Sequence, residues 1–359
     1  MKRSIQQIFD ESASSCGLTQ LVGNGSIEVQ KIAPFQKCGV GDLVFVPDAK
    51  ALTLVLEQGA SAAVIPKKLV TILETTEFST GFLVATNLGV AHALLKQKYG
   101  DHDYRRSGWS RIHPSAVIHE SVKIPKSTSI GPNVVIEQGA RIGKNCSIMA
   151  NVVIEHDAII GKNVRIHPGT TIGWECEIGE DSMILSNTVI GGEGFGYAQD
   201  QHFNHYRIPQ TGNVIIGKKV TIGANNTIDR GTYGPTRIGD GCIFDNMCHV
   251  AHNVTVGKNC IILSGFLCAG STTLGDRVVV SGGAIIKDHV KISDDTYLMH
   301  RAGVIKDITQ GGMYAGSPVL PMKDYVMSNA VYSRLGELRK KVNEMAKQMD
   351  GQKEDSALK

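Results

Sequence analysis

The chain has 359 residues, including 40 glycines, and its 37 Lys and Arg side chains nearly balance 34 Asp and Glu. This balance gives no indication of nucleic-acid binding. No stretch approaches the roughly 18 apolar residues of a transmembrane segment, and the start lacks the apolar run of a secretory signal. We therefore expect a cytoplasmic protein.

Residues 1–107 alternate short apolar runs, typical of strands, with helical stretches. The predicted strands are 27–31, 43–46, 62–65 and 82–85, and the predicted helices are about 3–14, 49–58 and 88–98. These elements predict a small α/β domain that ends at 107, where a polar link precedes a different pattern.

A six-residue repeat organises residues 108–318. Isoleucine occupies every sixth position from Ile112 to Ile190, the pattern resumes at Ile216, and after a slip of four residues it runs from Ile238 to Val304. This period is typical of a parallel β-helix. If three hexapeptides close one coil, residue i lies under residue i+18, about 4.8 Å away along the axis.

One long insertion, residues 191–213, interrupts the repeat, and a smaller slip follows at 229–235. Insertions in such solenoids form loops on one face and often carry binding sites. Glycines flank Phe195 and Tyr197, which favours a shaped loop whose role the pattern leaves open. The eight cysteines include no Cys-x-x-Cys pair, so we expect packed reduced thiols.

Residues 319–359 form the third predicted domain, a helix and a disordered tail from 352. Apolar residues follow heptad spacing at Val331, Leu335, Leu338, Val342, Met345 and Met349. Because a seam this narrow is hard to bury against one β-helix, it favours association of helices from sister subunits, and we expect a homotrimer.

The candidate chemistry centres on His252. The register places Gly270 on the next coil, so that an imidazole would lie beside an unobstructed backbone N–H. Acyl transfer needs this pair, as a base for the nucleophile and a donor for the oxyanion. His289 lies two coils above, about 10 Å from His252, too far to share a metal, and no metal site is predicted.

An ordered set of motifs carries a resemblance over nearly the whole chain. The motifs are GGEGFGYA at 191–198, TIDRG at 227–231, FDN at 244–246, VAHNV at 250–254, AGS at 269–271 and YAGSP at 314–318. The sequence resembles the UDP-3-O-acylglucosamine N-acyltransferases of lipid A biosynthesis, within the hexapeptide acyltransferase superfamily. The resemblance implies a left-handed parallel β-helix with a small N-terminal α/β domain and a C-terminal helical tail.

The resemblance also implies roles for individual residues. His252 would be the general base that takes a proton from the sugar 2-amine, and the Gly270 N–H would hold the oxyanion. Asp245 would help to orient the imidazole. His289 would contact the nucleotide sugar, and Asn246 of the FDN motif would also bind substrate.

In the N-terminal domain, the family grips uracil with a Phe-x-x-Asn-x-Lys-Tyr pattern. Here Phe45 and Lys50 match, Asp48 replaces the amide, and Ala51 replaces the second aromatic residue. We therefore expect Phe45, Asp48 and Lys50 to bind the UDP-sugar.

The acyl donor implied by the resemblance is a 3-hydroxyacyl group on the phosphopantetheine of acyl carrier protein, as co-substrate, with no further cofactor. Because such carriers are acidic, basic residues after the active region are candidate contacts: Lys306, Arg339 and Lys340.

Alternative functions remain open. A sister hexapeptide sugar acyltransferase would use a different sugar, such as a diamino sugar, or a different acyl donor. A hexapeptide carbonic anhydrase would hold zinc, which the metal content of the purified protein would reveal. A pure scaffold would leave His252, Gly270 and His289 on one face unexplained.

Overall fold

The computed structural model describes residues 1–73, 78–103, 108–316 and 322–357. The chain divides into two compact units, Met1–Tyr104 and Arg105–Lys359. The domain boundary expected at 107 and the one expected at 318 both fall outside the described residues.

The first unit contains a five-stranded sheet in the order β2-β7-β6-β5-β4, parallel except for the antiparallel β2–β7 pair. Its strands are β2 (Leu18–Val22), β4 (Lys31–Ile32), β5 (Asp42–Phe45), β6 (Ala62–Pro66) and β7 (Gly81–Ala85). The helices are α1 (Ile5–Cys16), α2 (Ala49–Gln58), the 3₁₀ turn η1 (Lys67–Leu69), α3 (Val70–Leu73) and α4 (Leu88–Gly100). A separate pair joins β1 (Arg3–Ser4) to β3 (Glu28–Val29).

The α/β prediction for this unit is confirmed, with two local differences. The strand predicted at 27–31 is two short strands, because β3 pairs with β1 whereas β4 pairs with β5. The strand Leu18–Val22 was not predicted. Its sequence, LTQLV, does not alternate apolar and polar residues, and its pairing with β7 shifts register between Leu18 and Gln20.

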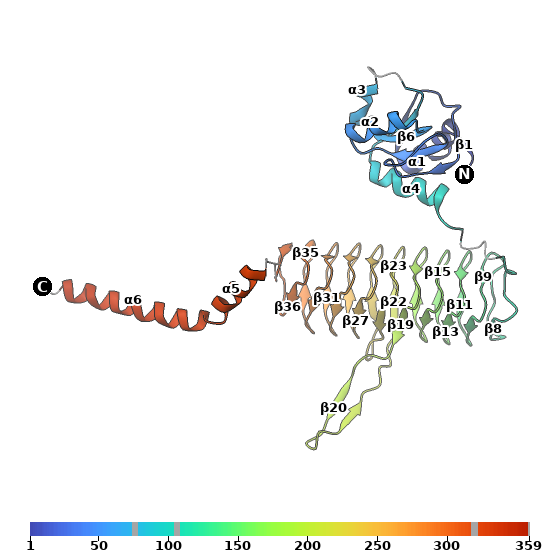
Figure 1. Ribbon diagram of the computed structural model, residues 1–359. Helices are drawn as coiled ribbons and strands as arrows, with labels where there is room; N and C mark the ends of the chain where they lie inside the picture. The colour runs from blue at the N-terminus through green and yellow to red at the C-terminus, as the bar shows by residue number, and fades with distance from the viewer. Residues whose placement is uncertain (74–77, 104–107, 317–321, 358–359) are drawn as a thin grey trace. The chain divides into compact units, whose positions relative to one another are not determined.

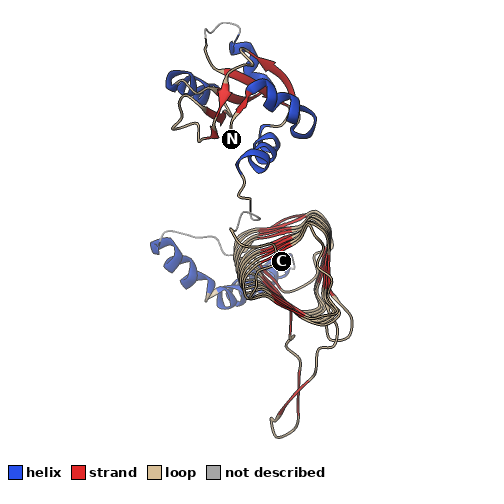
Figure 2. Ribbon diagram, turned by 90° about the vertical axis from the view of Figure 1, so that its right-hand side faces the viewer, coloured by secondary structure: helices blue, strands red, loops and turns tan. Residues whose placement is uncertain are grey.

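The second unit is a left-handed parallel β-helix, seen end on as a triangular tube in Figure 2. It has three parallel sheets of ten, eight and ten short strands, and Val135–Ile136 pairs with Val153–Ile154, eighteen residues later. The predicted register of i and i+18 is therefore confirmed.

The strands of each sheet follow one another along the helix axis. One ten-stranded sheet contains β8 (Val117–Ile118), β10 (Val135–Ile136), β13 (Val153–Ile154), β16 (Thr171–Ile172), β19 (Val189–Gly192), β24 (Thr227–Asp229), β27 (His249–Val250), β30 (Leu267–Cys268), β33 (Ile285–Ile286) and β36 (Gly303–Val304). The eight-stranded sheet contains β11 (Arg141–Ile142), β14 (Ile159–Ile160), β17 (Glu177–Ile178), β22 (Val214–Ile216), β25 (Thr236–Ile238), β28 (Thr255–Val256), β31 (Thr273–Leu274) and β34 (Lys291–Ile292). The other ten-stranded sheet contains β9 (Ser129–Ile130), β12 (Ser147–Ile148), β15 (Arg165–Ile166), β18 (Met183–Ile184), β23 (Thr221–Ile222), β26 (Ile243–Phe244), β29 (Ile261–Ile262), β32 (Val279–Val280), β35 (Thr296–Leu298) and β37 (Gly312–Tyr314).

Each hexapeptide alternates an inward aliphatic side chain with a tight corner. Ile154 and the small corner residue Val152 are both fully buried, whereas Asn151 before the corner has a left-handed backbone, φ 59°. Asn and Asp tolerate this conformation better than other non-glycine residues. Cysteines at the corners, such as Cys176, are free and buried as predicted, and burial raises the pKa of the Cys176 thiol to about 11.

The insertion at 191–213 leaves the β-helix between β19 and β22. Its middle forms an antiparallel hairpin of β20 (Tyr197–Gln199) and β21 (His205–Arg207), which projects from the side of the tube (Figure 1). The hairpin is exposed, whereas Gln210 near its return is only 3% exposed. The insertion is therefore a shaped loop that is anchored where it joins the tube.

The chain ends in two helices, α5 (Met322–Tyr332) and α6 (Leu335–Ala357). The expectation of one helix and a disordered tail from 352 is wrong, because the chain turns at Ser333–Arg334 and α6 continues to Ala357. The heptad side chains from Val331 to Met345 are each 46–62% exposed in the single chain. Met349 lies outside the residues whose side chains are described.

Candidate active site

His252 follows β27, and its imidazole lies against the backbone of Gly270 on the next coil. A Cβ atom placed on Gly270 would be 2.6 Å from Cε1 and 2.8 Å from Nε2 of the ring. Only glycine leaves room for the imidazole in this position. The eighteen-residue register thus brings together the two residues that the sequence paired.

The Gly270 backbone has one engaged and one free polar group. Its carbonyl accepts a hydrogen bond of 3.1 Å from the His289 N–H on the following coil. Its own N–H donates to no acceptor among the described residues. A donor without a partner beside an imidazole is the arrangement that an oxyanion needs.

His289 occupies a left-handed corner, φ 56°, and its side chain is 73% exposed. Its Nδ1 lies 3.0 Å from Oδ2 of Asp288, and this hydrogen bond is the main cause that lowers the pKa of the Asp288 carboxyl. The ring is thus held at the surface one coil beyond Gly270.

The Nδ1 atom of His252 has its partner on the adjacent residue. Asn253 Nδ2 lies 2.9 Å from this nitrogen and donates to Thr232 Oγ1 at 3.0 Å. The backbone N–H of Thr232 donates to Asn253 Oδ1 at 2.9 Å. The amide orientation is therefore set by a backbone donor, and Nε2 of His252 remains for a substrate.

Asp245 and Asn246 do not reach His252 within one chain. They follow β26, which belongs to a different sheet from β27. Asp245 Oδ1 accepts from the Asn246 N–H, and Asn246 Oδ1 accepts from the Ala224 N–H at 2.7 Å. Asn246 is thus engaged in holding adjacent coils together.

A second histidine, His249, lies on the outer surface of β27. Its Nδ1 is 2.8 Å from Thr227 Oγ1, and its Nε2 is 3.8 Å from Asp229 Oδ2. Burial raises the pKa of Asp229 to about 7, and burial also lowers the pKa of His249, to which the nearby charge of His252 contributes. His249 and Asp229 therefore form a pair of titratable groups on this sheet, and His249 is close enough to His252 to feel its charge.

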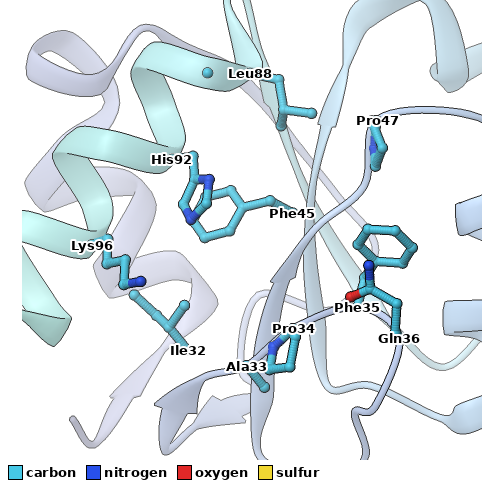
Figure 3. Close-up of a pocket in the computed structure, with 11 residues that line it drawn as sticks. Ile32, Ala33, Pro34, Phe35, Gln36, Phe45, Pro47, Leu88, His92 and Lys96 are labelled. Carbon is cyan, nitrogen blue, oxygen red and sulfur yellow. The ribbon is translucent and has the colours of Figure 1, made fainter. Parts of the chain in front are cut away.

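The N-terminal unit has its own cavity of about 510 Å³, which Phe45 lines at the end of β5. The Phe45 ring stacks on His92 of α4, with centroids 4.1 Å apart, and Lys96 projects beside them (Figure 3). Pro34 and Phe35 form another part of the cavity wall. An aromatic surface with a nearby cation suits a flat base carrying a phosphate.

Asp48 and Lys50 line a neighbouring hollow of about 570 Å³ that shares only Phe35 with the first. Asp48 is the N-cap of α2, where Oδ1 accepts from the Ala51 N–H at 2.9 Å. Such a cap contributes about 1 kcal/mol. Of the three residues expected to bind uridine, Phe45 thus lines one hollow, whereas Asp48 and Lys50 line the other. The Asp48 carboxylate is already bonded to the Ala51 N–H.

The candidate carrier contacts are exposed cations. Lys306 lies after β36, and Arg339 and Lys340 lie on α6. Among the described residues, no group of three or more His, Cys, Asp or Glu side chains could hold a metal ion. No helix in the described part of the chain is long and apolar enough to cross a membrane.

Sequence reasoning missed most of the contacts around His252. Gly194 packs against the His252 side chain and Asn253 bonds to its Nδ1, whereas Thr232 and Gln210 support Asn253 through hydrogen bonds, and none of these residues was predicted to have a role. The available signal was the order of the motifs along the chain: GGEGFGYA and TIDRG both precede VAHNV, and they lie in or overlap the two irregular segments of the repeat.

Comparisons with known proteins agree with this architecture. The family model described as GMPPB C-terminal domain matches residues 107–195, that of bacterial transferase hexapeptide (six repeats) matches 235–265, and that of the hexapeptide repeat of succinyl-transferase matches 213–246 and 252–287. Among solved structures, the chain is similar to Arabidopsis UDP-N-acetylglucosamine acyltransferase, with 25% identity and a TM-score of 0.52. That match covers 57% of this chain and 71% of the other.

Curated relatives reach further along the chain. UDP-3-O-acylglucosamine N-acyltransferase of Methylococcus capsulatus is 44% identical over 351 residues, which are 97% of this chain and 98% of the relative. The probable mitochondrial UDP-3-O-acylglucosamine N-acyltransferase 2 of Arabidopsis thaliana is 41% identical over 37% of this chain and 44% of its own. With this identity over nearly its whole length, the chain belongs to the UDP-3-O-acylglucosamine N-acyltransferase family and is an acyltransferase of lipid A biosynthesis built on a hexapeptide-repeat β-helix.

Proposed function

We propose that the protein transfers a 3-hydroxyacyl chain from acyl carrier protein to the 2-amine of a UDP-3-O-acyl-glucosamine in the cytoplasm, with His252 as general base. The contact of the His252 ring with Gly270 is the observation that carries this proposal. The experiment is to incubate the protein with acyl carrier protein and nucleotide sugar and to measure the product by mass spectrometry. A product without the mass of one added 3-hydroxyacyl group would contradict it.

In the proposed reaction, the amine nitrogen attacks the thioester carbonyl and forms the new C–N bond. The carbonyl oxygen becomes negative and accepts from the Gly270 N–H, while His252 takes the amine proton. The C–S bond then breaks, and the imidazolium returns a proton to the departing carrier thiolate. Atoms and charges balance without a metal or a redox cofactor.

The remaining substrate contacts belong to the same proposal. His289, exposed one coil beyond Gly270, would contact the nucleotide sugar. Phe45 and Lys50 would bind its uridine end, with Asp48 capping the helix that carries Lys50. Asp245 and Asn246 could serve a His252 ring only from a neighbouring subunit, because they follow a different sheet in their own chain.

The assembly is proposed to be a homotrimer. The apolar side chains of α6, such as Leu338 at 52% exposed and Met345 at 62%, have no cover in the single chain. Exposed apolar seams of this kind are usually buried between subunits. Light scattering at micromolar concentration should give three times the 38.6 kDa of one chain, and a stable monomer would contradict the assembly.

Carrier binding should depend on charge. The double reversal Arg339→Glu and Lys340→Glu should raise the KM for the acidic carrier by about tenfold while the KM for the sugar changes little, because exposed charges steer association. Steady-state kinetics at several salt concentrations measure this. The matched control reverses the charges of Lys123 and Lys126, which are exposed in the first coils. An equal rise in the carrier KM in that control would contradict a specific docking surface at Arg339 and Lys340.

The amide of Asn253 sets a further condition. Since Thr232 N–H occupies Oδ1, the amide presents N–H to Nδ1 of His252, which suits a neutral ring protonated on Nε2. For Nε2 to accept the amine proton, the amide has to turn so that its oxygen accepts from Nδ1–H.

The variant Asn253→Asp tests this condition, because a carboxylate offers oxygen in either orientation. We expect kcat within a few-fold of wild type, and a fall of kcat/KM at higher pH than in wild type, since a carboxylate favours the protonated ring. Asn253→Leu should lower kcat roughly 100-fold, because the ring loses its orienting partner. Equal loss in both variants, read from pH–rate profiles, would refute proton acceptance at Nε2.

A further inference from the structure

Arg230 is a buried cation at the base of the inserted loop. It follows β24, is 2% exposed, and belongs to no ion pair among the described residues. Its guanidinium lies 3.6 Å from the ring centroid of Trp174, whose other ring contact is a parallel stack with His156. Burying a charge is costly unless its donors are satisfied, so its hydrogen bonds need an account.

The donors of Arg230 go to backbone carbonyls. Nε donates to Gly191 O at 2.9 Å, Nη1 to Gly212 O at 2.9 Å, and Nη2 to Trp174 O at 3.2 Å. Gly191 lies in β19, one residue before the chain leaves the tube for the loop, and Gly212 lies two residues before β22, where the chain returns. One planar guanidinium therefore ties together the two ends of the insertion, in a way that the single ammonium of lysine cannot match.

The outgoing arm of the loop reaches His252 directly. Gly194, three residues after Gly191, packs so closely that an added Cβ would lie 2.8 Å from Cβ of His252 and 3.2 Å from the carbonyl oxygen of Arg230. The outgoing arm therefore restricts the position of the His252 Cβ atom, and with it the directions in which the imidazole can point.

The returning arm reaches the same imidazole through hydrogen bonds. Gln210 donates from Nε2 to Ile208 O, and its Oε1 accepts from Thr232 Oγ1 at 2.8 Å. Thr232 in turn accepts from Asn253, whose amide lies on Nδ1 of His252. The chain of bonds begins two residues before Gly212, at a side chain that is 3% exposed.

We propose that Arg230 is a positioning residue for His252: by tying Gly191 to Gly212, it holds both arms of the inserted loop against the imidazole. The expected effect of Arg230 on turnover rests on the proposed function. The expected effect of Arg230 on the position of the loop does not depend on that function. The hairpin beyond the arms is exposed, so the loop is held at its base. Backbone bonds there join each arm to the tube separately, at Gly192 and at Gly212, whereas the Arg230 side chain bonds to both arms at once.

The test compares Arg230→Lys with the matched control Arg237→Lys, an exposed arginine on β25. Loosening of the arms should lower kcat by up to about 100-fold, because small displacements of a catalytic group have this effect, with the sugar KM changed much less. The control should keep wild-type values. Thermal unfolding of both variants establishes that the protein assayed is folded.

Limited trypsin digestion measures how often the inserted loop opens, and it does not require an activity assay. Arg207 is the one Lys or Arg in residues 191–213, and it is exposed. Cleavage after Arg207, followed by mass spectrometry of the full-length protein, should become at least about tenfold faster in Arg230→Lys if the population of open loop rises. Cleavage at the wild-type rate in Arg230→Lys would overturn the clamp even if the chain proved to have another substrate.

A double-mutant cycle with Gln210→Leu separates positioning from a general structural role. If Arg230 acts through the returning arm, the combined loss in kcat should be clearly smaller than the product of the two single losses. A folded Arg230→Lys protein with wild-type kcat, or losses that multiply fully, would refute the positioning role.

Discussion

Replacing His252 by alanine should lower kcat by about 10²–10⁴, the usual contribution of a positioned acid–base group, with little change in substrate binding. The His252 ring bonds through Nδ1 to Asn253 and packs against the backbone of Gly270. Removing the imidazole therefore deletes the proposed base and leaves the packing inside the β-helix unchanged. Steady-state kinetics with acyl carrier protein and nucleotide sugar measure the effect.

Two other histidines serve as controls for that experiment. His289→Ala should mainly raise the KM for the nucleotide sugar, since its side chain is exposed beyond Gly270. His249 bonds to Thr227 and lies near Asp229, so His249→Ala should retain most of kcat. An inactive His249→Ala together with an active His252→Ala would reverse the assignment of the base.

Replacing Gly270 by alanine should have the second largest effect, a fall in kcat of roughly 100-fold. The new methyl group would come within 3.0 Å of three atoms of the His252 ring, so the imidazole has to move away from the backbone donor. Gly270 is not among the residues with positive φ, so alanine suits its backbone and the protein should fold.

Gly234→Ala is the matched control for this steric argument. A Cβ at Gly234 meets no atom within 4 Å, although the residue lies in the neighbouring irregular segment. It should keep wild-type kcat and a wild-type unfolding temperature. Wild-type turnover in Gly270→Ala would show that the contact between His252 and this backbone has no part in the reaction.

The sequence predicted the parts of the structure that depend on local repetition. Because each hexapeptide forms the same strand and corner, spacing alone predicted that His252 lies under Gly270, and the strand register agrees. The heptad pattern predicted helix from Val331 onward but not the turn at Ser333–Arg334, because interrupted helices can share one apolar spacing. In the N-terminal unit the edge strand Leu18–Val22 was not predicted, because its residues show no periodic pattern of apolar and polar side chains.

The surroundings of His252 were decided only by tertiary structure. Asn253 faces Nδ1 because Thr232, brought near by the slip in the repeat, donates its backbone N–H to the amide oxygen. Arg230 reaches Gly191 and Gly212 because a 23-residue insertion, 191–213, leaves and re-enters the tube beside it. A repeating pattern in the sequence cannot predict the contacts between the segments that interrupt it. Those contacts depend on where the chain returns to the tube in space. The sequence by itself therefore determined the tube and the pairing of His252 with Gly270, and the folded loop determined how that imidazole is held.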